Sequence, residues 1–118
     1  MTDKQLHELF RAWQAKLNLS HWFLTLSIDH LMPQAGVTES MWEYLEATST
    51  INPTYIREKK VQFDEELVIV HELCHVMLAS LWTDADELTE HERMLHERTV
   101  EELSRTLLDI VGTLRYAG

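Results

Sequence analysis

The sequence predicts a small α+β domain in which helices cover one face of a short sheet. Apolar residues alternate with polar ones at 22–28 and 46–51, as in half-buried strands. Longer segments on both sides, at 3–17 and from about residue 64 onwards, carry apolar residues at helical spacing instead. The chain of 118 residues shows no internal repeat and no linker, so we expect a single domain, residues 1–118.

The first element is predicted to be an amphipathic helix over residues 3–17. Thr2 or Asp3 is available to cap its N-terminus. Its apolar stripe, which we expect to pack in the core, comprises Leu6, Leu9, Phe10, Trp13 and Leu17.

Strands are predicted in the middle of the chain. Residues 22–28 are rich in aromatic and β-branched side chains and alternate in polarity, so they predict one strand. Pro33 and Gly36 then mark a turn. Residues 41–51 alternate again and end before Pro53, so one or two further strands fit there, most clearly at 46–51. Helix-forming residues leave the first half of this segment open between strand and helix.

Two helices complete the predicted order. After a polar connection, Asp64 can cap a strongly apolar helix that runs to about Trp82, where the polar residues 83–86 end it. Thr89 and Glu92 form a capping box in front of a last, long helix. Its expected apolar face comprises Val100, Leu103, Leu107, Val111 and Leu114.

The apolar helix carries an HExxH motif, His71-Glu72-Leu73-Cys74-His75. Positions i and i+4 of a helix lie about 40° apart around its axis and about 6 Å apart along it, so both histidines can hold one zinc ion. Glu72 lies beside that face, where a carboxylate can take a proton from a zinc-bound water. The alternative is that His71 and His75 are core histidines with separate hydrogen-bond partners. Cys74 is expected to pack as a small hydrophobe.

A catalytic zinc commonly has three protein ligands, so a further residue must reach the ion. On the last helix Glu97 lies about 70° from the centre of the apolar face and is the best-placed acid. His96 lies nearer the centre and is the competing ligand. Glu101, about 110° from the centre, can accept a hydrogen bond from a ligand histidine.

Composition excludes several classes of function. The formal net charge of −10, with ten Lys and Arg in total, argues against binding to nucleic acid. A single cysteine excludes an internal disulfide and favours a reducing compartment. No secretory signal and no apolar run long enough to cross a bilayer are seen, so we expect a cytoplasmic protein with no membrane partner.

The motif followed by Glu97 and Glu101 resembles the zinc metallopeptidases of the HExxH-plus-glutamate type, the gluzincins. In these enzymes the third ligand lies on a second helix, often with an acidic residue one turn later. The layout of residues 20–112 is similar to small single-domain metallopeptidases of phage and prophage genomes. The resemblance implies a minimal zincin-like domain with one zinc held by His71, His75 and Glu97.

The resemblance also implies the activity, hydrolysis of peptide bonds in a peptide or protein substrate with Glu72 as general base. In such enzymes the substrate usually lies as an added strand along the sheet edge, which residues 47–50 would resemble here. Open candidates for the donor that stabilises the oxyanion are Tyr116, Arg115, Arg98 and His96.

Two other classes of function compete with a peptidase. One is a zinc-binding interaction or regulatory protein of the same fold with little or no turnover, because a zinc ion adds stability to a short chain. The other is a metal-free helical adaptor that uses its acidic surface. A stoichiometric zinc would exclude the adaptor. The sequence predicts neither the substrate's identity nor the oligomeric state.

Overall fold

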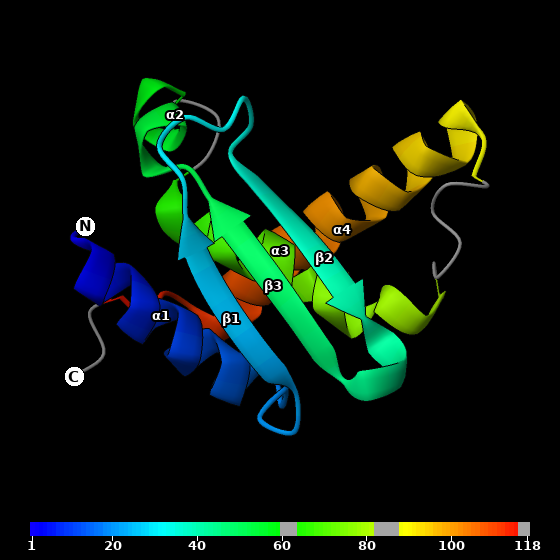
Figure 1. The fold of residues 1–118 in the computed structure, drawn as a ribbon, viewed down its shortest axis with the longest axis horizontal. Helices are drawn as coiled ribbons and strands as arrows, with labels where there is room; N and C mark the ends of the chain where they lie inside the picture. The colour runs from blue at the N-terminus through cyan, green and yellow to red at the C-terminus, as the bar shows by residue number, and fades with distance from the viewer. Residues whose placement is uncertain (60–63, 82–87, 116–118) are drawn as a thin grey trace.

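The predicted α+β order is confirmed in a computed structural model, which describes residues 1–59, 64–81 and 88–115. These residues form four α-helices and a three-stranded sheet (Figure 1). The first helix, α1, spans Asp3–Lys16, with Thr2 as its N-cap and a capping box to Gln5. Of its predicted apolar stripe, Leu6, Leu9, Phe10 and Trp13 are buried, and Leu17 is the half-buried C-cap.

The sheet consists of β1 (Phe23–Ile28), β2 (Gly36–Met41) and β3 (Glu46–Ile51), in the spatial order β1-β3-β2. β1 runs parallel to β3, and β2 runs antiparallel to β3. The strands predicted at 22–28 and 46–51 are confirmed as β1 and β3, to within one residue at each end. The turn predicted from Pro33 and Gly36 is confirmed in the connection between β1 and β2, residues 29–35, and Gly36 itself begins β2. A short 3-10 turn, Trp42–Tyr44, joins β2 to β3 and accounts for the mixed signal there.

The strand order corrects one further expectation. Residues 47–50 belong to β3, which pairs on both sides and is the central strand of the sheet. They cannot be the edge that accepts an added strand. The edge strand beside the motif helix is β2, which makes more contacts with that helix than β3 does.

A short helix that the sequence reading placed in a polar connection follows the sheet. This helix, α2, spans Pro53–Glu58. The Asn52 side chain accepts a hydrogen bond from the backbone N–H of Tyr55 (3.1 Å), and Pro53 occupies the first helical position, which needs no hydrogen-bond donor. The Asn52 amide also donates to the carbonyl of Met32 (2.6 Å), which ties the loop before β2 to the end of β3.

The motif helix, α3, spans Glu65–Met77 and is followed by a 3-10 turn at Ala79–Leu81. Asp64 caps it as predicted, since its side chain accepts from the backbone N–H of Leu67 (2.8 Å). The predicted end at Trp82 and the breaker at 83–86 lie outside the described residues. The helix is apolar nearly all round, because it is packed on several sides.

The last helix, α4, spans Glu90–Val111 and has the predicted capping box at Thr89 and Glu92. It ends at Gly112, whose φ of 83° stops the helix. Leu114 is therefore not part of the helix, contrary to the prediction, although it still packs against the core. None of the helices among the described residues is long and apolar enough to span a membrane.

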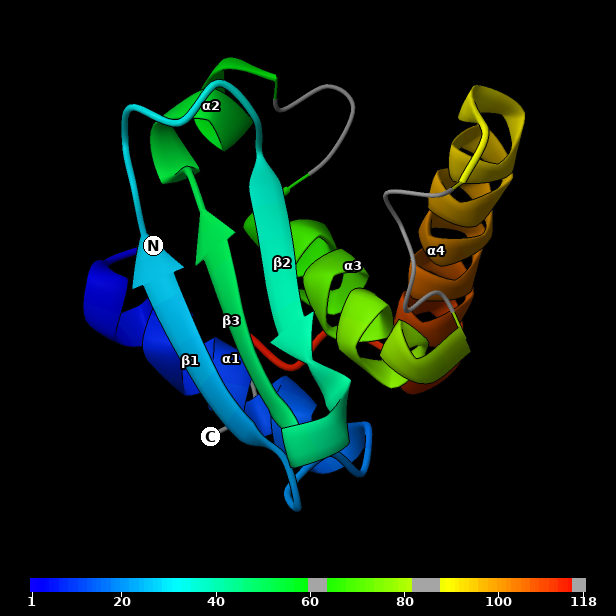
Figure 2. The ribbon, with the colours of Figure 1, turned by 45° about the vertical axis from the view of Figure 1, so that its right-hand side comes forward.

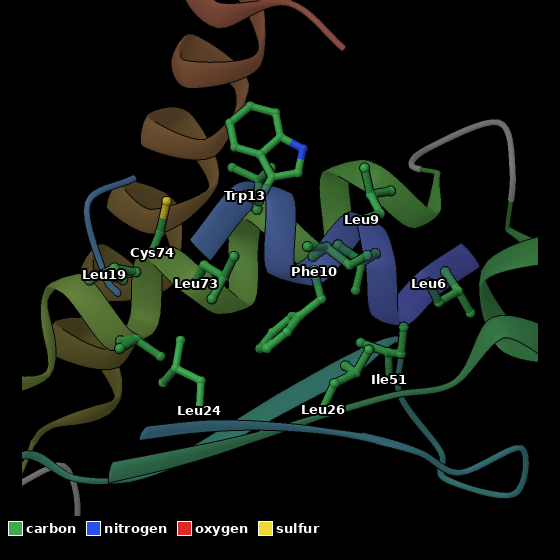
Figure 3. Packing of buried hydrophobic residues seen from close by; sticks show 14 of the residues in the cluster. Leu6, Leu9, Phe10, Trp13, Leu19, Leu24, Leu26, Ile51, Leu73 and Cys74 are labelled. Carbon is green, nitrogen blue, oxygen red and sulfur yellow. The ribbon is translucent and has the colours of Figure 1, made fainter. Parts of the chain in front are cut away.

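The elements form two main layers, with the sheet on one side and α1 and α3 on the other (Figures 1 and 3). Side chains from α1, from α3 and from the inward face of β1 and β3 fill the space between them, with Phe10 among the largest. The buried indole of Trp13 lies on the side of α1 that faces away from the sheet. α3 lies between β2 on one flank and α4 on the other (Figure 2). This position brings the motif against both the sheet edge and the last helix.

Glu66, in the first turn of α3, joins distant parts of the chain. Its side chain is 2% exposed and accepts hydrogen bonds from the indole N–H of Trp13 (2.8 Å) and the backbone N–H of Leu114 (2.8 Å). The Thr113 hydroxyl donates to its other oxygen, and Arg115 lies 3.7 Å from that oxygen. The buried carboxylate therefore fixes α1, α3 and the segment after α4 to one another.

Candidate metal centre

The three predicted metal ligands come together where α3 faces α4. The Nε2 atom of His71 lies 3.4 Å from Oε2 of Glu97, and Nε2 of His75 lies 3.4 Å from Oε1 of the same carboxylate. The two imidazole rings are 5.0 Å apart between centroids and meet edge to face. One helical turn separates the histidines on α3, and the packing of α4 against α3 supplies the glutamate.

These separations fit a metal ion. One potential ligand atom from each of the three residues lies within 4.8 Å of the others. Two ligands bound about 2.1 Å from a tetrahedral zinc are about 3.4 Å apart. Each histidine nitrogen lies at this separation from one Glu97 oxygen, His71 from Oε2 and His75 from Oε1. Two nitrogens and one carboxylate oxygen are also a donor set that suits zinc.

Glu101 lies one turn beyond Glu97 and contacts His71 from the other side of its ring. Nδ1 of His71 is 2.9 Å from Oε2 of Glu101, so the predicted hydrogen bond between these residues is present. A proton on Nδ1, donated to Glu101, leaves Nε2 as the ligand atom. Arg105 donates to the other oxygen of Glu101 (2.7 Å), which holds the carboxylate in place.

His96, the competing third ligand, lies beside the site. Its ring centroid is 5.3 Å from that of His75, in an edge-to-face arrangement. Burial and the neighbouring His75 lower its pKa, which favours the neutral ring. Among the described residues the group with metal-holding geometry contains Glu97 and does not contain His96.

Charges in the site are coupled across the two helices. Burial lowers the pKa of His71, but the hydrogen bond to Glu97 and the charges of Glu72 and Glu97 outweigh it, so the pKa is raised above 6.5. The hydrogen bonds from His71 and His75 hold the pKa of the Glu97 carboxyl far below its usual range. The carboxylate of Glu97 thus favours the protonated form of His71 when no metal is bound.

Glu72 points away from α4, toward the start of β2. It is 4% exposed, and its Oε1 accepts a hydrogen bond of 2.8 Å from the hydroxyl of Thr38. The Thr38 hydroxyl also lies 2.8 Å from that of Ser49 on β3. Burial raises the pKa of the Glu72 carboxyl above 4.5, although both histidines and Thr38 oppose this shift. The carboxylate is therefore a stronger base than one in water.

Gly36 makes room for this carboxylate. A Cβ atom at residue 36 would lie 2.8 Å from Oε2 of Glu72, closer than such atoms approach each other. From the sequence, Gly36 was only a turn signal, and the positions of Thr38 and Ser49 beside Glu72 were not predicted. The contact of Thr38 with Glu72 crosses 34 residues of chain, and Ser49 contacts Thr38 on the neighbouring strand, so neither leaves a local pattern.

A pocket opens beside the motif, between the start of β2 and α4. It has a volume of about 140 Å³, and its lining includes Gly36, Leu67, Val68, His71, Glu72 and Glu101. His71 and Glu72 thus line the same cavity as Gly36, the first residue of β2. Such a cavity can hold part of a ligand next to both residues.

The remaining candidates lie elsewhere. Cys74 is fully buried, and burial raises the pKa of its thiol to about 12, so it packs as the predicted hydrophobe. Arg115 pairs with Asp64 at the start of α3, and Arg98 pairs with Glu102 on the outside of α4. Of the four candidate oxyanion donors, His96 is the one next to the motif, and Tyr116 lies outside the described residues.

A scan against protein-family models, a search of curated proteins and a search of solved structures give no match to this chain. The class of the protein is therefore inferred from the geometry of the site.

Proposed function

We propose that the protein is a zinc-dependent peptidase with a minimal, gluzincin-like zincin fold. His71, His75 and Glu97 hold one zinc ion, Glu101 orients His71, and Glu72 is the general base. The observation that carries the proposal is the meeting of Glu97 with both motif histidines at ligand-like distances, across two helices. Scattered core histidines would not be expected to share one carboxylate in this way.

Zinc, when bound, lowers the pKa of a coordinated water toward neutrality and polarises a carbonyl oxygen. Glu72 takes a proton from the attacking water and later gives it to the departing amine. Its raised pKa suits both steps, because the carboxyl can accept and release a proton closer to neutral pH. Thr38 fixes Oε1, so we assign proton transfer to Oε2.

The substrate is an extended peptide that pairs with β2. This strand uses one edge to pair with β3, and among the described residues no strand pairs with its other edge. β2 lies along α3, and its first residue, Gly36, lines the pocket beside His71 and Glu72. A peptide added to this edge gains backbone hydrogen bonds and passes next to the metal centre.

The burial of Glu72 favours a second candidate, a zinc-binding regulatory protein with little turnover. At 4% exposure, with one oxygen held by Thr38, the carboxylate has little access to water. In that case zinc would join α3 to α4 and stabilise the fold without chemistry.

The first prediction separates these functions with one substitution. Glu72→Gln should keep one zinc per chain, because Glu72 is not among the ligands, and should lower peptide cleavage by about 100-fold or more, since the base is lost. The measurements are elemental analysis and mass spectrometry of a peptide mixture incubated with the protein. His71→Ala is the control and should lose the zinc.

Other combinations of zinc content and cleavage rate contradict one or both of these functions. Zinc in the wild type without any cleavage supports the regulatory protein, and cleavage by Glu72→Gln at the wild-type rate removes Glu72 as the base. Absence of stoichiometric zinc after purification and zinc addition contradicts both functions.

A further inference from the structure

The face of the sheet opposite to α1 and α3 is open. No element of the described residues covers it (Figures 1 and 3). The strand register places its outward side chains in rows across the three strands. One row is Phe23, Glu46 and Met41, and the next is Thr25, Thr48 and Glu39. We call these six residues the outer surface.

The outer surface is hollow and partly apolar. All six of its residues line a cavity of about 350 Å³. Phe23 is 73% exposed and Met41 is 50% exposed, and both line this one cavity. They stand on the two edge strands, with Glu46 between them on the central strand. The ring of Phe23 and the thioether of Met41 therefore line two sides of the cavity, with the carboxylate of Glu46 between them.

The charge of the outer surface has one sign. β1, β2 and β3 contain no Lys or Arg, and their two charged residues, Glu39 and Glu46, both belong to the outer surface and are exposed. A cation is the complement of this arrangement: its charge pairs with the carboxylates, and its stem or plane lies on Phe23. The hydroxyls of Thr25 and Thr48 can accept further hydrogen bonds.

A second copy of the chain fits this surface poorly. Two copies related by a two-fold axis would bring the same patch against itself, so the glutamates of one would face those of the other. Like charges placed opposite each other across strands are destabilising. The charge thus selects a different, basic partner.

We propose that the outer surface is a docking site for a basic segment of a partner protein, with an Arg or Lys side chain seated between Phe23 and Met41. Apolar side chains next to that cation cover the exposed ring and thioether. The site lies on the opposite side of the sheet from Glu72 and the metal centre. The inference therefore does not depend on zinc or on peptidase activity.

The test uses the whole chain and two synthetic peptides. One is acetyl-Leu-Arg-Val-Arg-Leu-amide, and the other carries citrulline, which is uncharged, in place of each arginine. Titration followed by backbone amide NMR should show shifts concentrated at 23–25, 39–41 and 46–48 with the arginine peptide. The citrulline peptide should bind roughly fivefold more weakly or worse.

Matched variants connect the binding to the two carboxylates. The double variant Glu39→Gln, Glu46→Gln should bind the arginine peptide roughly fivefold more weakly or worse. Glu8→Gln with Glu58→Gln makes the same charge change at exposed positions on α1 and α2 and should change affinity by less than about twofold.

Three results would overturn the inference. The first is shifts confined to other acidic surfaces, such as α4, and the second is equal loss of affinity in both double variants. The third is a concentration-dependent dimer, seen by sedimentation, that Phe23→Ser abolishes, because the occupant would then be a second copy.

Discussion

Single side chains set the chemistry of the motif, and Glu72 shows how. Its carboxylate lies between Thr38 on one side and the Cα of Gly36 on the other, within a largely apolar helix. Ser49 is 1% exposed and lies within hydrogen-bond distance of Thr38, so the donor is itself held in place. Contacts with the sheet therefore fix the orientation of the Glu72 carboxylate.

The second prediction concerns Thr38. Thr38→Val keeps the shape of the side chain but removes the hydroxyl that donates to a buried carboxylate. We expect the free energy of unfolding to fall by about 1–3 kcal/mol, the cost of leaving such a group without its donor. Urea unfolding measures the change, and peptide cleavage should fall while the zinc content stays the same.

Thr25→Val is the matched control for Thr38→Val. Thr25 is an exposed residue on the outward side of β1, and valine has a high strand propensity, so the free energy of unfolding should change by no more than about 0.5 kcal/mol. An equal loss in both variants would mean that the hydroxyl of Thr38 does not hold Glu72.

The third prediction is a pH dependence of the zinc-free protein. The pKa of His71 is raised above 6.5, so the folded state binds this proton more tightly than the unfolded state. Its contribution to stability is complete below about pH 6.5 and is lost as the pH rises through the folded-state pKa. The free energy of unfolding should therefore fall as the pH rises above about 6.5.

Burial of Glu72 acts in the same direction, because its carboxyl pKa is raised as well. His71→Asn isolates the histidine and should flatten the dependence over this range. His91→Asn, an exposed substitution on α4, should leave it as it is. A steeper dependence in His71→Asn than in the wild type would contradict the assignment.

At this scale the sequence gives the helical half of the site and misses the half on the sheet. The spacing of His71 and His75 within one helix predicts that they share a face, with Glu72 beside it. The positions of Glu97 and His96 around the last helix left these two residues as candidates for the third ligand. The contacts of Glu72 with Gly36 and Thr38 depend on the docking of a strand on a helix, which no local pattern encodes.

At the scale of elements, α4 must hold Glu97 and Glu101 in register with α3. Its N-terminal turn is exposed and depends on the capping box of Thr89 and Glu92, in which each side chain bonds the backbone N–H of the other residue. Val100 is the one residue of the predicted apolar face that is fully buried. Local hydrogen bonds therefore support the beginning of this helix more than packing does.

The fourth prediction compares two threonines of α4. Thr89→Ala removes the cap and should lower the free energy of unfolding by about 1 kcal/mol. Thr99 lies in the helix interior and its hydroxyl bonds the carbonyl of Leu95, four residues before it. Alanine is the better helix former at such a position, so Thr99→Ala should be neutral or stabilising by a few tenths of a kcal/mol.

Thermal unfolding measures both variants, and amide exchange in the first turn of α4 locates the effect of Thr89→Ala. Equal destabilisation by the two substitutions would show that packing, not capping, sets the stability of α4.

The elements that sequence patterns predicted are those with long or regular signals. α1, α3 and α4 were found from their apolar periodicity and their caps, and β1 and β3 from alternation. α2 was missed although Asn52 and Pro53 form a good N-cap and first helical position, because a helix of six residues has no periodicity to read. The position of β3 at the centre of the sheet depends on long-range pairing and could not be read from alternation.

At the scale of the whole molecule, Glu66 is the point where both ends of the described chain meet. Trp13 lies 53 residues before it, and Leu114 lies 48 residues after it. A buried carboxylate is costly without donors, and here it receives them from α1 and from the segment after α4. This role could not be predicted from the sequence, because an acidic residue in the first turn of a helix is also common at the surface.

The fifth prediction tests this connection. Glu66→Gln is nearly isosteric, but its amide group donates where the carboxylate accepts and faces the donors of Trp13, Thr113 or Leu114. We expect the free energy of unfolding to fall by about 1–3 kcal/mol, with faster amide exchange after Gly112. Glu58→Gln, at the exposed end of α2, is the control and should stay within about 0.5 kcal/mol of the wild type. An unchanged stability in Glu66→Gln would show that the network does not stabilise the fold.

Because β3 comes last among the strands but lies at the centre of the sheet, the order of synthesis limits the order of assembly. β1 and β2 leave the ribosome first, yet neither has a native neighbour at that stage. Both ladders wait for residues 46–51, which complete them from the middle outwards. Until then the nascent chain carries two unpaired strands, and α1 is the one α-helix preceding β3, with hydrogen bonds that need no later partner.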